Sequence, residues 1–449
     1  MTQFIREPAK DLPVAAQADL CVAGGSCTGV FAAVRAARLG LSVVLCERAG
    51  IPGGTATQGL VNIWHAVTDI DDREPVIAGL TSEVLDRLDR SGALLRQPLR
   101  TERYNFNPAE LVMELDGLIR ENRVRLLLHT LVCGAVEQDG SVRAVIVENG
   151  DGRQAIRADF FIDCTGDGVL AERLGVPSYS AARRQPPTCC FHLQGSLEDV
   201  DVGALTAAHG QEFGLPDAWG WGTAVAGCEG LSMRAESRVF GVNCERAADL
   251  TAAETEGRRQ VLAYVRLLQK YGRRDTHYAM MNLASSIGVR EALHYKTIFQ
   301  AAERPLLTGA RYDDPILQGT YPVDIHHAED NGLTWRHLDG RQVTVWGKES
   351  RREERNWRED LHLSGPYAKF YQVPFELLVG AKYRNFIAAG RMLNADEGAF
   401  GALRVMVNLN QLGEAAGAAA ALCLAQGCAL QALDGRQVTA ALRKGGSAL

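Results

Sequence analysis

A glycine-rich turn between two apolar segments restricts the folds that this chain of 449 residues can adopt. Residues 19–23 (DLCVA) are typical of a short buried strand, and residues 30–39 have the pattern of a helix with small residues on one face. Residues 24–29 (GGSCTG) form the turn between them, and residues 41–46 (LSVVLC) form a second apolar strand. The first fifty residues therefore predict a βαβ unit and an α/β fold.

The turn has the spacing of a dinucleotide-binding fingerprint, in which glycines let the backbone approach a pyrophosphate at a helix N-terminus. Glu47 ends the second strand, where a carboxylate accepts from both ribose hydroxyls of an adenosine. A tight βα turn without a ligand explains the glycines but not Glu47. An acidic residue favours FAD or NAD over NADP, although Arg48 weakens that preference. We expect cofactor contacts from Gly24, Gly25, Ser26, Cys27, Thr28, Gly29, Glu47 and Arg48.

Two departures from the usual fingerprint affect the expected phosphate contacts. Ser26 stands in place of the middle glycine, where its hydroxyl could hydrogen-bond the phosphates. Cys27 follows it, either as a residue that tunes the cofactor or as a small buried filler, and we favour the filler.

The pattern of elements changes three times along the chain. Residues 124–161 predict a β-meander with turns at Asp139-Gly140 and residues 149–152, and the meander leads into a buried strand over residues 158–164. From residue 189 the composition shifts toward aromatic and charged residues. Near the C-terminus we expect a strand over 385–389, a loop over 390–401 and a helix over 403–424. The predicted domains are an FAD-binding domain in two parts, 1–188 and 376–449, and an inserted substrate domain, 189–375.

Several ordered motifs together resemble the FAD-dependent oxidoreductase family with the glutathione-reductase-type fold. The first is Gly53-Gly54 followed by Thr-Ala-Thr, and the second is DCTGDG at residues 163–168. The C-terminal match is AGR at residues 389–391 and GALRVM at residues 401–406. The resemblance covers about residues 19–445. It implies a Rossmann-like three-layer FAD-binding domain with an inserted α+β substrate domain.

The resemblance also implies further FAD contacts. The Gly53-Gly54 loop is implied to follow the pyrophosphate and ribityl chain, Val132 to pass the adenine, and the segment after residue 164 to lie against the phosphates. The two C-terminal motifs are implied to reach the flavin ring. The expected residues are Gly53, Gly54, Thr55, Ala56, Thr57, Val132, Thr165, Gly166, Asp167, Gly390, Arg391 and Leu403.

Flavin carries out the redox chemistry, so the protein must supply a proton acceptor and orienting groups. His326, in YPVDIHH, is our first candidate for the acceptor, and His65 is the second, since imidazole titrates near neutral pH. Either histidine could instead satisfy a structural hydrogen bond. Arg290 and Arg404 suit an anionic or carbonyl-bearing substrate, although Arg290 could pair with Glu291.

Composition narrows the function further. A net charge of -6 and a pI near 6.0 argue against a nucleic-acid partner, and no apolar stretch is long enough to span a membrane. Eleven scattered cysteines and an N-terminus without a signal-peptide pattern predict reduced thiols and a cytoplasmic protein. No cluster suggests a metal, and residues 348–360 (KESRREERNWRED) predict a solvated helix face rather than a binding patch. Oligomeric state, a homo-oligomer included, stays open.

Three functions remain on these grounds. The first is a dehydrogenase or oxidase that takes hydride from an alcohol or amine carbon of a small molecule. The alternatives are a flavin-dependent C=C reductase or desaturase and a non-catalytic electron-transfer flavoprotein subunit. Trp219-Gly220-Trp221 lacks the Ile-Pro that follows in flavin-dependent halogenases, and adjacent Cys189-Cys190 do not form a C-x-x-C redox motif.

Overall fold

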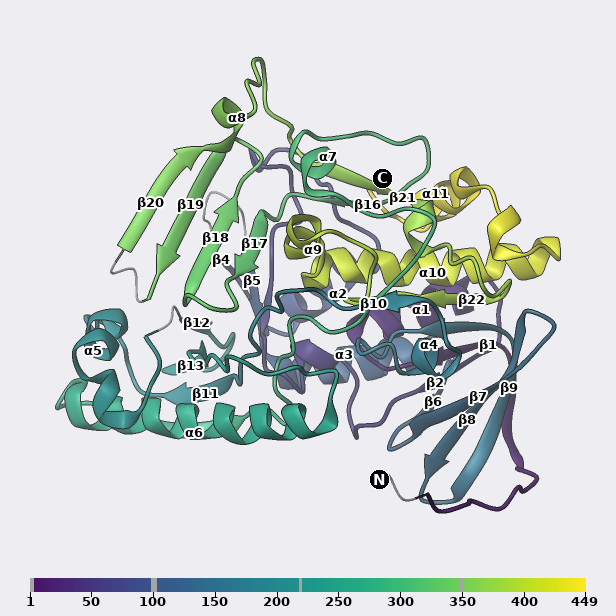
Figure 1. Ribbon diagram of the computed structural model, residues 1–449, viewed down its shortest axis with the longest axis horizontal. Coiled ribbons are helices and arrows are strands. Elements are labelled where there is room, and N and C mark those ends of the chain that lie inside the picture. Colours follow the sequence, from purple (N-terminus) through teal and green to yellow (C-terminus); the bar gives the residue numbers. More distant parts are fainter. Residues whose placement is uncertain (1–3, 98–102, 218–219, 348–350) are drawn as a thin grey trace.

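The computed structural model describes residues 4–97, 103–217, 220–347 and 351–449. Its largest sheet, called the central sheet below, has seven strands and lies on the right in Figure 1. Parallel pairs join β6 to β2, β2 to β1, β1 to β9, and β9 to β22. The chain therefore has the Rossmann-like α/β fold that the sequence predicts. The strands are β1 (Val14–Ala23), β2 (Val43–Cys46), β6 (Arg125–Leu127), β7 (Leu131–Gln138), β8 (Ser141–Asn149), β9 (Gly152–Asp163) and β22 (Phe386–Ala388).

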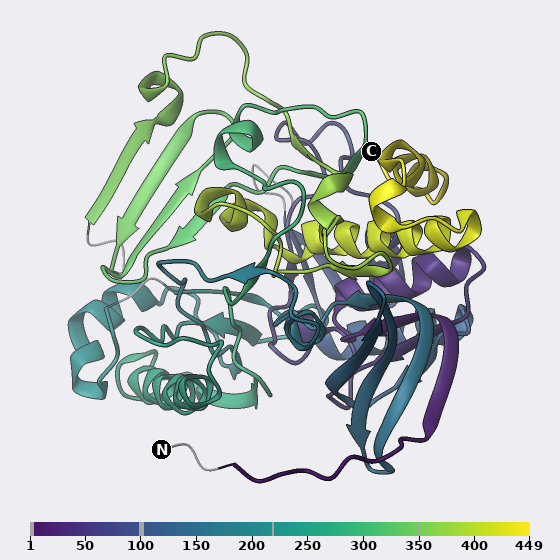
Figure 2. The same ribbon diagram turned by 45° about the vertical axis from the view of Figure 1, so that its right-hand side comes forward.

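Strand β9 belongs to two arrangements at once. Its first half pairs antiparallel with β8, which pairs with β7, while its second half pairs in parallel with β1 and β22. The antiparallel stretch begins at Leu131, not at residue 124 as the sequence suggested, because β6 pairs in parallel with β2. Figures 1 and 2 show this ribbon projecting from the central sheet.

Helices α1 (Cys27–Arg38) and α10 (Met406–Gln426) pack side by side against the central sheet in both views (Figures 1 and 2). Two glycines of α10 permit this contact, because a Cβ on Gly413 or on Gly417 would lie 2.2 Å from a carbonyl oxygen of α1. Every residue of α10 from Val407 to Ala421 is buried, so this part of the helix has no solvent face.

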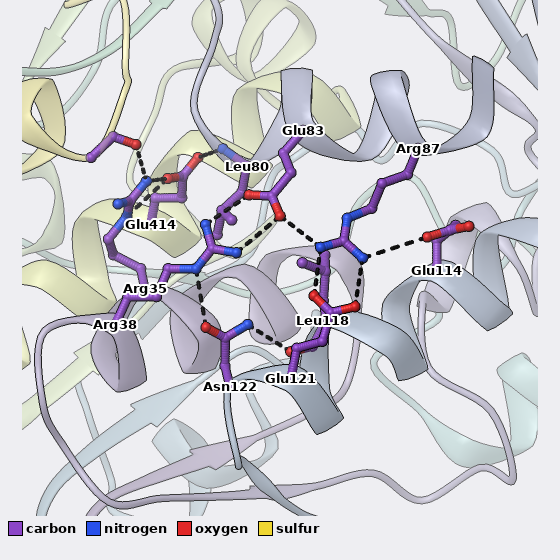
Figure 3. A network of polar contacts seen from close by, with 11 residues as sticks. Arg35, Arg38, Leu80, Glu83, Arg87, Glu114, Leu118, Glu121, Asn122 and Glu414 are labelled. Carbon is purple, nitrogen blue, oxygen red and sulfur yellow. Dashed lines mark hydrogen bonds and ion pairs between the residues drawn. The ribbon is translucent and has the colours of Figure 1, made fainter. Parts of the chain in front are cut away.

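An ion pair buried between these helices joins more distant parts of the chain (Figure 3). Arg35 of α1 pairs with Glu414 of α10, and both side chains are less than 5% exposed. Glu414 also accepts from the amide of Leu80 at 2.9 Å, and Arg35 donates to Gly445 O at 2.9 Å. The pair therefore connects α1 and α10 with the start of α2 (Leu80–Arg90) and with the C-terminal segment.

The C-terminal elements differ in one respect from the sequence prediction. The segment predicted as a loop over residues 390–401 contains helix α9 (Glu397–Leu403), and the long helix begins at Met406. Asp396 caps α9 by accepting from the amide of Ala399 at 2.8 Å, which offsets the weak helix propensity of the two glycines in α9.

The region after residue 189 contributes two four-stranded antiparallel sheets, at the end of the molecule opposite the β7–β8 ribbon (Figures 1 and 2). Helix α6 (Ala247–Tyr271) packs beside the first sheet. The first sheet contains β12 (Trp221–Ala224), β13 (Leu231–Ala235), β11 (Phe191–Gln194) and β14 (Ala279–Leu283), and the second β17 (Val323–His326), β18 (Gly332–Arg336), β19 (Arg341–Trp346) and β20 (Arg351–Asn356).

The prediction of a helix for the charged stretch at residues 348–360 is wrong. Its described part forms strand β20 and the short helix α8 (Trp357–Asp360), because β20 pairs residue by residue with β19. The side chains of residues 351–355 are exposed, as expected of a solvated surface. Residues 348–350 of that stretch, and Trp219, lie outside the described residues.

Smaller elements complete the fold. They are α3 (Pro108–Glu121), α4 (Val169–Arg173), α5 (Val202–His209), α7 (Glu303–Leu307), α11 (Gly435–Lys444), β3 (Ile63–Trp64), β4 (Leu94–Gln97), β5 (Arg103–Phe106), β10 (Ser178–Tyr179), β15 (His294–Tyr295), β16 (Pro315–Gly319) and β21 (Tyr371–Pro374). Across the described ranges, no helix combines the length and hydrophobicity needed to cross a membrane.

Candidate functional site

The turn between β1 and α1 leaves room only for glycine at two of its positions. Gly24 has a φ of +95°, and a Cβ there would lie 2.6 Å from the backbone of Cys164 at the end of β9. A Cβ on Gly29 would lie 1.9 Å from Gly24 O. The backbone of the turn therefore passes close to the ends of β1 and β9 at the point where α1 begins.

Glu47 points back into this turn from the end of β2. Its Oε2 accepts from the amide of Gly25 at 2.7 Å and its Oε1 from the amide of Ala49 at 2.8 Å, with the residue 6% exposed. Residues 127–132 run beside it, since Thr130 N donates to Glu47 O at 2.9 Å, and this segment leads to Val132 on β7. Arg48 turns outward and lies 3.8 Å from Asp167 Oδ2.

The two residues that depart from the usual fingerprint are both held by the protein itself. Ser26 caps α1: its Oγ accepts from the amide of Gly29 at 3.3 Å and donates to Cys164 O at 3.2 Å. Cys27 is buried with its Sγ 3.5 Å from Gly53 O, and burial raises the pKa of its thiol to about 12. Amides of the first helical turn, including that of Thr28, have no acceptor within the helix and suit a pyrophosphate.

The Gly53-Gly54 loop lies directly against this turn. Gly53 N donates to Gly25 O at 2.8 Å, and a Cβ on Gly54 would lie 3.1 Å from that of Ser26. The loop continues as a short 3₁₀ turn that includes Thr55 and Ala56, and Thr57 closes it by donating to Pro52 O at 2.6 Å. The structure thus brings together the two glycine-rich segments that the sequence predicts as cofactor contacts.

A third segment lies beside them at the end of β9. The buried carboxylate of Asp163 shapes it by accepting from Thr165 N, Thr165 Oγ1 and Ala171 N at 2.7 to 2.9 Å. Arg391, which follows Gly390, donates to Gly166 O at 2.9 Å and pairs with Asp167. The C-terminal motif is therefore fixed to the turn after β9.

The end of α9 and the start of α10 complete the arrangement. Leu403 is fully buried, Arg404 follows it, and α10 begins at Met406 without a side-chain cap from Val405. An uncapped helix N-terminus presents free amides and a positive dipole end, which stabilise negative charge on a nearby group.

These features fit FAD in this chain. Glycines without space for a Cβ, the N-terminus of α1 and Glu47 would hold the pyrophosphate and the adenosine ribose. Within the described ranges, no three His, Cys, Asp or Glu side chains gather so as to hold a metal ion.

A polar cluster lies where β17 meets α9. Asp324 accepts at Oδ2 from Tyr321 Oη at 2.8 Å and from Arg404 at 3.0 Å, and its Oδ1 lies 3.5 Å from His326 Nε2. Although burial favours its neutral form, the neighbouring His326 and Arg404 hold the pKa of the Asp324 carboxyl well below its usual range. Asp324 is therefore ionised at neutral pH.

The two candidate histidines are both part of this cluster. Burial and then Arg290 and Arg238 hold the pKa of His326 well below its usual value of 6.5. The ring of His65 lies against that of Tyr321, with centroids 4.3 Å apart and planes tilted by 44°, and burial together with Arg103 lowers the pKa of His65 to about 3. Both imidazoles are therefore neutral at neutral pH.

The sequence left open an ion pair between Arg290 and Glu291, and the structure does not show this pair. Arg290 Nη1 donates to Thr188 Oγ1 at 2.7 Å, and Glu291 contacts His294 at 3.1 Å instead. Arg238 also donates to Thr188 Oγ1 at 2.7 Å. Two guanidinium groups that share one acceptor oxygen lie close together, and their like charges repel. All four predicted catalytic residues therefore lie in or beside one positively charged cluster.

Sequence reasoning missed three members of this cluster. Gln185 accepts from the amide of His326 at 3.3 Å and from Arg404 at 3.1 Å, while Thr188 and Arg238 form the contacts described above. None of these residues stands in a motif. A buried residue such as Arg238, which is 3% exposed, is found only when distant segments are placed in space.

Residues 19–442 match the family described as FAD dependent oxidoreductase. A probable electron transfer flavoprotein-quinone oxidoreductase of Escherichia coli (strain K12), YgcN, is 29% identical over 165 residues, a stretch that spans 35% of this chain and 38% of that protein.

Two solved structures resemble most of the chain. One is a geranylgeranyl bacteriochlorophyll reductase-like protein of Thermoplasma acidophilum, with 11% identity, a TM-score of 0.47 and coverage of 96% of this chain and 82% of that one. The other is a triple mutant of the flavin-dependent brominase Bmp2, with 10% identity, a TM-score of 0.47 and coverage of 95% and 84%. The family match spans nearly the whole chain, and the chain therefore belongs to the FAD-dependent oxidoreductase family, with FAD as its cofactor.

Proposed function

We propose that this protein oxidises a small organic molecule at a carbon that carries a hydroxyl or amino group, with His326 as the proton acceptor. The observation that carries this proposal is a buried, neutral imidazole beside an ionised carboxylate, next to the C-terminal motif of the FAD site. When bound, FAD supplies the hydride acceptor, N5 of the flavin.

The residues of the cluster have separate roles in this proposal. His326 takes the proton of the substrate hydroxyl or amine, and Asp324 stabilises the imidazolium that results. Arg404 and Tyr321 hold the Asp324 carboxylate in place through its Oδ2. Gln185 positions His326 through the backbone amide of that residue. His65, beside Tyr321, is the second candidate acceptor.

The start of α10 assists the same reaction. Arg404 and the free amides of the uncapped first turn place positive charge at the position that the family resemblance assigns to the pyrimidine edge of the flavin. Positive charge there favours the gain of electrons by the cofactor.

Electron transfer to a protein or quinone partner is the second candidate function. The partial likeness to YgcN, named a probable electron transfer flavoprotein-quinone oxidoreductase, supports it. In that case a small molecule alone would not reduce the flavin at a useful rate. A C=C reductase or desaturase is the remaining alternative and needs an external reductant.

An anaerobic titration of the FAD-loaded protein distinguishes these functions. Polyols, amino acids and amines are added in turn while the visible flavin bands are recorded. We expect one donor class to bleach the bands rapidly. Bands that respond only to NAD(P)H would support the reductase. Bands that no small molecule reduces would contradict the proposed dehydrogenase or oxidase and support the role in electron transfer with a protein partner.

A further inference from the structure

Three arginines from distant parts of the sequence meet in the cluster beside His326. Arg238 and Arg290 each donate to the single hydroxyl of Thr188 at 2.7 Å. Arg404 approaches from the end of α9 and reaches Asp324 and Gln185. The charges of Arg238 and Arg290 are felt at the imidazole of His326, whose pKa they help to lower.

The acidic residues near this cluster do not balance its charge. Glu236 pairs with Arg234, and Glu291 contacts His294. Asp324 contacts Arg404. In the part of the chain that the structure describes, no ion pair is found for either Arg238 or Arg290. The cluster therefore carries excess positive charge in a buried position.

Several hydrogen-bond donors in the cluster are also buried without an acceptor. They are Nη2 of Arg238, Nε of Arg404 and Nε2 of Gln185, each without a partner among the described residues. Arg238 is 3% exposed and Gln185 is 4% exposed. Buried donors usually have acceptors, and guanidinium groups match the two oxygens of a carboxylate. A carboxylate would supply acceptors for more than one of these donors.

We propose that Arg238 and Arg290, assisted by Arg404, bind the carboxylate of the substrate. The inference rests on the proposed function and narrows it to small carboxylic acids with a hydroxyl or amino group on the carbon that is oxidised. The carbon–hydrogen bond breaks and its electron pair passes as hydride to FAD, while the hydroxyl or amine proton passes to His326. The product is a carbonyl or imine compound whose carboxylate is unchanged.

The test compares carboxylates with their neutral amides on the FAD-loaded protein, without turnover. Propanoate with propanamide, and benzoate with benzamide, are titrated by calorimetry and by perturbation of the flavin spectrum. We expect at least one carboxylate to bind about 10- to 100-fold more tightly than its amide, the range of a charge-assisted hydrogen bond. Equal binding of both members of each pair, or no binding of any carboxylate, would overturn the proposal.

Variants of Arg238 test whether the carboxylate binds at this cluster. Arg238→Gln should weaken binding of the carboxylate by about 10-fold or more and leave amide binding unchanged. Arg436→Gln is the control, since Arg436 is an exposed residue of α11 that pairs with Asp434, and the change should leave both affinities unchanged. If Arg238→Gln does not fold, Arg238→Lys keeps the charge but loses the two-pronged geometry, and the carboxylate preference should fall.

Two outcomes separate this inference from other roles. A variant of Arg238 that shifts the flavin reduction potential without changing carboxylate affinity would assign the arginine to the cofactor and contradict the inference. A retained carboxylate preference in a protein that no small donor reduces would contradict the proposed function alone, because binding is measured without turnover.

Discussion

Replacing Glu414 by glutamine should destabilise the protein much more than the same change at Glu83. The side chain of Glu414 is 1% exposed, and its Oε2 accepts from Nε of Arg35 at 3.0 Å (Figure 3). Glutamine keeps an acceptor for the amide of Leu80 but removes the counter-charge of Arg35, whose side chain is 4% exposed. The buried guanidinium is then left with the neutral oxygen of Gly445.

The expected loss follows from burial. Removing one partner of a buried ion pair costs about 3–5 kcal/mol, because the other charge stays buried. Burial raises the pKa of Glu414, and Arg35 opposes this rise only in part. The attraction between the two side chains therefore does not fully offset the cost of burying the carboxylate. The double variant Arg35→Met with Glu414→Met should therefore recover much of the loss. Glu83 pairs with Arg38 at side-chain exposures near 30%, and such a pair contributes about 0–1 kcal/mol.

Urea unfolding of the FAD-loaded protein, followed by circular dichroism and by flavin release, measures these differences. The midpoint should fall strongly for Glu414→Gln, slightly for Glu83→Gln and little for the double variant. A Glu414→Gln midpoint no lower than that of Glu83→Gln would refute the reasoning. A double variant as unstable as the single one would show that lost packing, not a stranded charge, sets the cost.

Two further predictions concern the cofactor turn and the pH dependence. Gly29→Ala places a Cβ 1.9 Å from Gly24 O and should abolish tight FAD binding, whereas Gly150→Ala, with nothing within 4 Å, should bind FAD normally in a fluorescence titration. Equal FAD affinities in these variants would contradict the turn geometry. The pKa of His326 is lowered below 6.5 in the folded protein, so its base form persists as the pH falls from 8 to 6.5. The rate of flavin reduction should show no His326 titration in that window, and stability should decline below pH 6.5, where the unfolded chain binds the proton more readily. A loss of rate with an apparent pKa near 7 that disappears in His326→Asn would contradict this assignment.

The fold around the cofactor could be predicted because its signals are local. Gly24 and Gly29 at the end of an apolar strand, and Glu47 at the end of the next, specify a βαβ unit within fifty residues. Helix α9 was missed because its glycines are weak helix formers, although Asp396 before them is a typical N-cap.

The charged stretch and the arginine cluster could not be predicted for a different reason. Basic and acidic side chains are interspersed along Arg351 and its neighbours in a pattern that suits either a helix or a strand. Pairing with β19 decides in favour of the strand. Arg238 and Thr188 stand 50 residues apart and meet Arg290 and Arg404 only in the folded chain. Such clusters depend on long-range packing, which leaves no periodic signal in the sequence.

The most direct test of the account is the rate of anaerobic flavin reduction by the best donor in His326→Asn and His327→Asn. His327 follows His326 on the chain but contacts Asp330 and Thr334, so it is a matched control. We predict that His326→Asn slows reduction by about 10²- to 10⁴-fold, the range of a general base, and that His327→Asn changes it little. Equal rates in the two variants would contradict His326 as the proton acceptor.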